Sequence, residues 1–181
     1  MKRVALGVLA WLLAASPVAP LGAQQALAGV RGEMLKQIDD AASKLTQLAQ
    51  AIPQDKYGWR PGAGVRSISE VLLHVAGANY LLPTFTGVKS PVEVNESMAT
   101  SMTDRTQVMD FMRRSFDHVR GALRALPDAD LDKAATIFGQ QSTNRDAYLT
   151  AVSHAHEHLG QLIAYARMNG IVPPWSQQRG Q

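Results

Sequence analysis

Apolar residues recur at every third or fourth position in four long stretches of the chain. This spacing is typical of an α-helix with one buried face. The predicted helices cover residues 27–51, Ser67 to near Pro83, 103–126, and Ser142 or Thr143 to just before Gly170. In the first helix, the predicted buried stripe consists of Val30, Met34, Ile38, Ala41, Leu45 and Leu48.

Residues with known preferences for helix ends mark several of these boundaries. Pro53 ends the first helix, because proline has no N–H to donate inside a helix. Ser67 followed by Glu70 predicts a capping box at the start of the second helix. Gly170 suits the left-handed position just beyond the last helix, and two prolines soon after it prevent continuation.

The connections between the predicted helices are of unequal length. Residues 53–66 form a loop, in which Tyr57 and Trp59 are expected to cover an end of the bundle. Residues 84–101 form a long link, and residues 127–141 form a second connection with a brief helical turn. No segment alternates regularly enough to predict a strand. The sequence therefore predicts an all-α fold, a four-helix bundle.

The N-terminus has the pattern of an export signal. Lys2 and Arg3 precede the apolar run 4–15, which is too short to cross a bilayer, and small residues place a cleavage site after Ala23. We therefore predict a signal peptide at 1–23 and a single domain at 24–181, which would be periplasmic or secreted and without a stable membrane anchor. The alternative is an uncleaved membrane anchor.

Charge and cysteine content exclude several classes of function. After the predicted cleavage, 16 Lys and Arg face 15 Asp and Glu, so the mature domain is almost neutral. Basic residues do not gather in a dense stripe with aromatic residues between them, so nucleic acid is not an expected partner. The chain has no cysteine, which excludes disulfides, thiolate ligands and a lipid-modified N-terminal cysteine.

Three of the five histidines fall within the five positions 154–158. In a helix, His154 and His158 lie on one face, because four residues advance about 400° and leave an offset of about 40°. Two imidazoles one turn apart can bind a single divalent ion. His156 is rotated by roughly 200° from His154 and is expected to point elsewhere.

A third ligand has to come from another helix, and His74 is the best candidate because it lies on an otherwise apolar face. Three neutral imidazoles suit Zn²⁺, Ni²⁺, Fe²⁺ or Mn²⁺, with open positions left for water or substrate. Two other interpretations remain open at this point. His74 could be a core histidine with a hydrogen-bond partner, and the run at 154–158 could be a solvated polar face.

Three further residues are candidates to orient the ligands or a substrate. Gln161 and Tyr165 continue the helical stripe of His154, at seven and eleven residues beyond it. Glu70 lies one turn before His74, so it could accept a hydrogen bond from a ligand or be a fourth ligand. The predicted capping box explains Glu70 equally well.

Two other features that involve histidine are weaker indications of a functional site. The run His156-Glu157-His158 is not the H-E-x-x-H motif of zinc proteases, because the second histidine would have to stand at Gly160. His118, between charged neighbours, is expected at the surface or between two helices.

Three stretches resemble the DinB/YfiT-like superfamily of metal-binding four-helix bundles. They are Tyr57-Gly58-Trp59-Arg60-Pro61 with the segment up to Ala76, His154-x-x-x-His158-Leu159-Gly160-Gln161, and the ending 164–174. The resemblance implies a bundle with up-down-down-up connectivity, which agrees with the long link at 84–101. It also implies that His74, His154 and His158 are the metal triad, and that the protein could form a homodimer.

Some members of this superfamily resemble thiol-dependent transferases, and others hydrolases. Leu159 stands where the family often has a basic residue, and export would remove the protein from cytoplasmic thiols. Both features argue against a thiol-dependent S-transferase. We therefore expect a metal-dependent hydrolase or group transferase acting on a small molecule. The alternatives are a non-catalytic metal-binding or stress-related protein, a thiol-dependent S-transferase, and a bundle whose histidines only hydrogen-bond.

Overall fold

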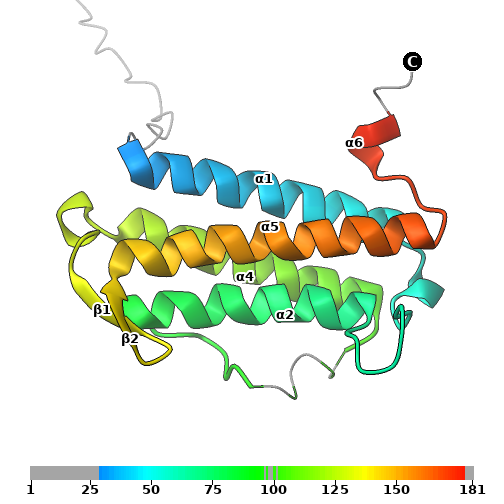
Figure 1. The fold of residues 1–181 in the computed structure, drawn as a ribbon, viewed down its shortest axis with the longest axis horizontal. Helices are drawn as coiled ribbons and strands as arrows, with labels where there is room; N and C mark the ends of the chain where they lie inside the picture. Colours follow the sequence, from blue (N-terminus) through cyan, green and yellow to red (C-terminus); the bar gives the residue numbers. More distant parts are fainter. Residues whose placement is uncertain (1–28, 96, 98–99, 101, 178–181) are drawn as a thin grey trace, which may run out of the picture.

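The computed structural model of the protein describes residues 29–95, 97, 100 and 102–177. Four long helices form a bundle, with a small hairpin at one end (Figure 1). They are α1 (Gly29–Ala51), α2 (Ile68–Leu81), α4 (Arg105–Ala125) and α5 (Asn144–Met168). The shorter pieces are η1 (Gln54–Lys56), η2 (Leu82–Thr86), η3 (Asp128–Asp130) and α6 (Pro174–Gln177). The predicted signal peptide, 1–23, lies outside the described residues.

The helices follow the up-down-down-up order that the resemblance implies. In Figure 1, α1 and α5 run in one direction, and α2 and α4 run in the other. Each of α1 and α2 packs against both α4 and α5. Because α2 and α4 are parallel, the link between them has to return along the length of the bundle, which explains why it is long (Figure 1).

Each long helix turns an apolar face into one shared core and a polar face outward. The predicted stripe of α1 is buried from Met34 onward, but Val30 is 41% exposed, which corrects that part of the prediction. Val30 lies in the first described turn of α1, before the buried stretch that begins at Met34. Among the described residues, none of the helices has the length and apolarity needed to span a membrane.

The predicted helix ends are confirmed. The Ser67 hydroxyl accepts a hydrogen bond from the Glu70 backbone N–H, and the Glu70 carboxylate accepts one from the Ser67 backbone N–H. Gly170 has φ of 73°, the left-handed conformation expected directly after the last helix. Tyr57 is fully buried in the loop before α2 and donates a hydrogen bond to the Ala49 carbonyl, so it covers one end of the core.

The expectation of no strands is wrong for the second connection. Residues Ala134–Ile137 (β1) and Gln140–Thr143 (β2) pair as an antiparallel hairpin. Phe138 and Gly139, at the turn, have φ of 49° and 81°. Positive φ at both central positions is the mark of a type I′ turn, one of the two favoured two-residue hairpin turns. The sequence hides this turn because phenylalanine is an unusual residue there and the flanking strands are short and partly exposed.

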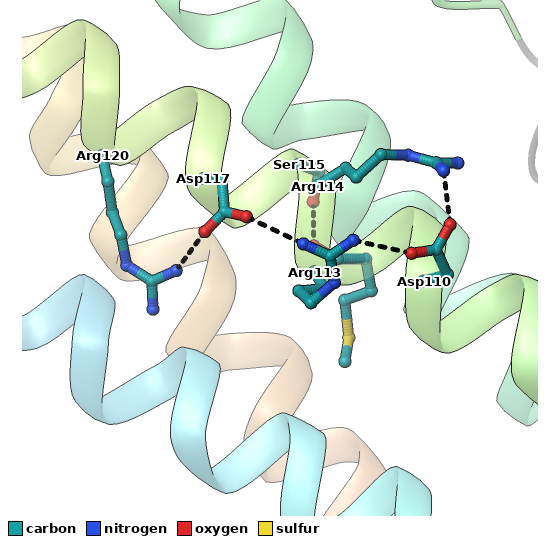
Figure 2. Close-up of polar contacts among 7 residues, drawn as sticks. Asp110, Arg113, Arg114, Ser115, Asp117 and Arg120 are labelled. Carbon is teal, nitrogen blue, oxygen red and sulfur yellow. Dashed lines mark hydrogen bonds and ion pairs between the residues drawn. The ribbon is translucent and has the colours of Figure 1, made fainter.

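The outward face of α4 is covered by ion pairs (Figure 2). Asp117 pairs with both Arg113 and Arg120, and Asp110 pairs with Arg113 and Arg114. Exposed pairs of this kind add little stability individually. Arg120 also bonds Asp39 of α1 at 2.6 Å, so the polar face helps to align α4 with α1.

Candidate metal centre

The packing of α2 against α5 brings three histidines together. His154 and His158 lie one turn apart on α5, and His74 lies in the second turn of α2. The three ring centroids are 4.5 to 4.8 Å apart. One nitrogen from each ring belongs to a group of ligand atoms that all lie within 4.8 Å of one another. The structure therefore places at one point the three residues that the sequence singled out as ligands.

The spacing of these nitrogens suits a single cation. The Nε2 atoms of His74 and His154 are 3.0 Å apart. Two nitrogens that bind one zinc ion at about 2.0–2.1 Å lie at most about 4.2 Å from each other. The whole triad, within 4.8 Å, is therefore only a small side-chain adjustment away from a shared ion. Three imidazole nitrogens are also a donor set that zinc, nickel and iron accept.

A chain of hydrogen bonds fixes the orientation of the His158 ring. The Gln161 amide nitrogen donates to the Tyr165 hydroxyl at 2.9 Å, so the Gln161 carbonyl oxygen is free to accept. His158 Nδ1 lies 2.7 Å from that oxygen and donates its proton to it. The lone pair of His158 is consequently on Nε2. Metal-binding histidines commonly donate their other N–H to such a partner.

Burial keeps the other two rings neutral. It lowers the pKa of His74 to about 4, with the positive charge of Arg66 adding to the effect. Burial likewise lowers the pKa of His154 to about 4, and the neighbouring His158 and His74 add to this. A neutral imidazole is the form that binds a metal ion. At pH 7, each ring therefore has one unprotonated nitrogen. In the structure one of the two Nε2 atoms donates a hydrogen bond to the other, so a tautomer shift to Nδ1–H on that ring is needed before both Nε2 atoms can bind a cation.

The Glu70 carboxylate binds Ser67 and Arg60, and none of its hydrogen bonds or ion pairs is with a histidine of the triad. Its carboxylate accepts the capping hydrogen bond from the Ser67 backbone N–H at 2.8 Å and forms an ion pair with Arg60, also at 2.8 Å. Burial opposes ionisation, but these two contacts outweigh it and lower the pKa of Glu70. Glu70 also lines the cavity beside His74. Its position fits a role in shaping the cavity, and no contact with the triad supports it as a ligand.

The other two described histidines face elsewhere. His156 donates from Nδ1 to the Val152 carbonyl, and its Nε2 lies 3.6 Å from the Asp40 carboxylate of α1, as its predicted rotation requires. His118 on α4 is half-buried against Tyr80 of α2, with ring centroids 5.2 Å apart. Burial lowers the pKa of His118. It is thus a residue between helices and takes no part in the triad.

A cavity of about 660 Å³ opens beside the triad. Its walls come from α2, α5, the long link and the hairpin. They consist of Arg66, Glu70, Leu73, His74, Gly77, Ala78, Leu81, Leu82, Val94, Asn95, Thr100, Phe138, Thr150 and His154. Two of the three histidines therefore face a space large enough for a small molecule, since ligand pockets have volumes of about 300–1,000 Å³.

The sequence did not single out Arg66, Thr150 or Phe138 as site residues. Thr150 lies one turn before His154 on α5, a spacing that could have drawn attention to it. Phe138 reaches the cavity only because of the hairpin, which the sequence did not predict. Arg66 precedes the capping serine, within a stretch that carries the family resemblance, but nothing in that pattern gave it a role at the site.

Comparison with protein families gives one match. The model of the DinB superfamily matches residues 37–162, which include α2, α4 and all three histidines of the triad. A search of curated proteins found no match.

Several solved structures are similar in fold. A DinB-like protein from Bacillus cereus ATCC 10987 has a TM-score of 0.71 at 20% identity, covering 80% of this chain and 95% of its own. A DinB-like protein from Bacillus subtilis has a TM-score of 0.61 at 22% identity, and the match covers 76% of this chain and 92% of that protein. YfiT from Bacillus subtilis, described as a probable metal-dependent hydrolase with an unusual four-helix bundle topology, has a TM-score of 0.64 at 14% identity, covering 86% and 97%. At these identities, the likeness shows the fold.

Proposed function

The chain belongs to the DinB superfamily, and on that premise we propose that it is a metal-dependent hydrolase or group transferase. His74, His154 and His158 would hold one divalent ion, Zn²⁺, Ni²⁺, Fe²⁺ or Mn²⁺. The observation that carries this proposal is the convergence of three ligand nitrogens from α2 and α5 within 4.8 Å. The description of YfiT as a metal-dependent hydrolase supports the same class of reaction.

The cavity supports an enzyme over a protein that only stores metal. His74 and His154 line a space of about 660 Å³. A site built only to hold an ion is closed by its ligands, whereas a catalytic site keeps a position open for water or substrate. Mostly apolar walls with a few polar groups are also typical of small-molecule sites.

The ion and the surrounding residues would divide the chemistry between them. A divalent ion held by three neutral histidines acts as a Lewis acid, which activates a water molecule or polarises a carbonyl group. Gln161 accepts the Nδ1 proton of His158, and Tyr165 orients Gln161, so the His158 lone pair stays directed at the site. Thr150, half-buried in the cavity wall, offers a hydroxyl to a bound substrate.

We also propose that the protein is exported and acts in the periplasm or outside the cell. The support is the charged start, apolar run and small residues of 1–23. Determining the N-terminal residue of protein recovered from the periplasmic fraction tests this directly. A mature chain that begins at or near residue 24 is expected, and a full-length cytoplasmic chain would contradict it.

Elemental analysis of purified protein tests the metal site. Wild type should contain close to one divalent ion per chain, and the His154→Ala/His158→Ala double variant should contain almost none. His156→Ala is the matched control, because this histidine lies in the same run but faces α1. It should retain the wild-type metal content. Equal metal content in the double variant and wild type would refute the triad as a metal site.

A further inference from the structure

The cavity changes in character along α2. Arg66, Glu70 and His74 line it near the start of the helix, and Leu81 and Leu82 line it at the other end. The distance from His74 to Leu81 along the helix is about 10 Å, at about 1.5 Å per residue. The wall formed by α2 is therefore polar at the histidine end and apolar beyond it, over a length that suits an extended chain. Thr150 of α5 adds one hydroxyl to the lining.

Phe138 completes the apolar end. It lines the cavity from the tip of the hairpin, and its ring packs edge-on against Phe85 of η2 with centroids 5.0 Å apart. Phe138 is 64% exposed and has a left-handed backbone conformation, with φ of 49°. A large apolar side chain in such a position gains little from the bundle core, so its placement at the cavity mouth points to an apolar ligand.

Arg66 gives the polar end a positive charge without a direct partner. The Glu157 carboxylate acts on His74 in the opposite sense, but it forms no ion pair with Arg66. Its guanidinium is exposed and has no hydrogen bond or ion pair with any other residue that the structure describes. It nevertheless lies close enough for its charge to act on both His74 and His154. Glu70, the acidic residue of the cavity wall, is already paired with Arg60. A cation beside the triad would add to this positive potential, which an anionic ligand would relieve.

We propose that the cavity binds amphiphilic carboxylates, with the carboxylate at Arg66 beside the triad and an unbranched apolar chain extending toward Leu81 and Phe138. A guanidinium matches a planar carboxylate with two parallel hydrogen bonds. This inference rests on the proposed function, because it takes the head group to lie next to the reactive ion. It assigns the substrate or product class as medium-chain acyl compounds with a free carboxylate.

Titration with straight-chain carboxylates of four to twelve carbons, and with the matching alcohols, tests the proposal. Calorimetry should show affinity rising about two- to fourfold per methylene. The rise should level off once the chain outgrows the roughly 10 Å of apolar wall. The alcohols should bind more weakly at every length. Carboxylates whose affinity is independent of chain length would overturn the assignment of the apolar end.

Two variants separate the two ends. Arg66→Gln should weaken every carboxylate about tenfold or more and leave the alcohols unchanged. Arg167→Gln, an exposed arginine away from the cavity, should match wild type. Phe138→Asn suits the left-handed turn and should fold, but it should lower affinity for long chains and spare butyrate. Wild-type carboxylate binding by Arg66→Gln would overturn the proposal.

Running the titrations on zinc-loaded and on chelator-treated protein keeps this inference separate from the proposed function. Suppose that the protein retains no zinc after loading, and that carboxylate binding depends on Arg66 and on chain length after either treatment. This result would refute the metal enzyme and uphold the carboxylate site. Stoichiometric zinc bound by a protein that takes no carboxylate in either form would do the reverse.

Discussion

At the scale of single residues, Gln161 is the group that controls the direction of the His158 lone pair. Its carbonyl oxygen lies 2.7 Å from His158 Nδ1, and its amide is held by Tyr165. Loss of such a partner typically costs 10- to 100-fold in metal affinity. We therefore expect Gln161→Ala to weaken zinc binding by about that factor, measured by competition with a chelator of known affinity.

The control for this prediction is Gln37→Ala, an exposed glutamine on α1. It should bind zinc as wild type does. Tyr165→Phe keeps Gln161 in place but removes the hydroxyl that orients it, so its effect should be smaller than that of Gln161→Ala. An unchanged zinc affinity in Gln161→Ala would show that the hydrogen-bond chain has no bearing on the metal.

The lowered pKa values of His74 and His154 predict how stability depends on pH in chelator-treated protein. Both values are about 4 in the folded state, against about 6.5 for an unperturbed histidine. As the pH falls below 6.5, the unfolded chain takes up protons that the folded protein does not. Stability should therefore be lost between about pH 6.5 and 4, and this contribution should be constant above pH 6.5.

Urea unfolding at pH 7.5, 5.5 and 4.5 measures this effect. Wild type should lose more stability on acidification than His74→Gln/His154→Gln, which lacks both titrating rings. The difference between the two proteins isolates the histidines from the carboxylates that also titrate at low pH. Parallel pH profiles for the two proteins would contradict the lowered pKa values of His74 and His154 in the folded protein.

The extent to which the site could be predicted differs from residue to residue. His154 and His158 follow from helix geometry alone, because a spacing of four fixes their common face. His74 stood out as a polar residue on an otherwise apolar face, and the family resemblance implied the same residue. That α2 packs beside α5, which periodicity does not reveal, is seen only in the structure. Arg66 lies outside any helical pattern, and nothing in the sequence gave it a role at the site. Its relevance appears only when its lack of a partner and its position at the cavity are known.

At the scale of elements, the start of α2 is where local sequence most directly positions the site. Ser67 and Glu70 exchange two capping hydrogen bonds two turns before His74. Replacing a capping serine by alanine typically costs about 1 kcal/mol. We expect Ser67→Ala to lower the free energy of unfolding by about that amount, measured by urea denaturation of chelator-treated protein.

Ser43→Ala is the matched control, since Ser43 lies on the exposed face of α1. Its effect should stay within about 0.5 kcal/mol. If both variants behaved alike, the cap would contribute nothing to the stability of α2. A capping loss that also lowered zinc affinity would further show that fraying of α2 reaches His74.

The hairpin shows why some elements cannot be predicted from pattern alone. Each strand has four residues, and neither β1 nor β2 alternates cleanly between buried and exposed positions. What holds the hairpin is the pairing of the two strands and the packing of Phe138 on Phe85, a contact across 53 positions of sequence. The long helices, by contrast, can be predicted from the sequence, because each buries a continuous stripe of apolar residues at helical spacing.

At the scale of the whole molecule, the up-down-down-up order is what brings α2 beside α5. The long link carries the chain back along the bundle, so α4 runs parallel to α2 and leaves α5 to close the remaining side (Figure 1). The triad joins two helices that are far apart in sequence. A bound ion therefore contributes to holding the bundle together, and metal binding is coupled to global unfolding.

This coupling predicts that metal raises the thermal stability of the whole domain. Zinc at about 100 times its dissociation constant stabilises a folded protein by about 2.7 kcal/mol, provided that the unfolded chain does not bind it. For a domain of this size, that corresponds to an increase in Tm of about 5 to 10 °C. Calorimetry should show this increase for wild type and for His156→Ala, and none for His154→Ala/His158→Ala. An equal increase in Tm for the double variant would place the stabilising ion away from the triad. Metal bound at the triad would then make no contribution to the stability of the bundle.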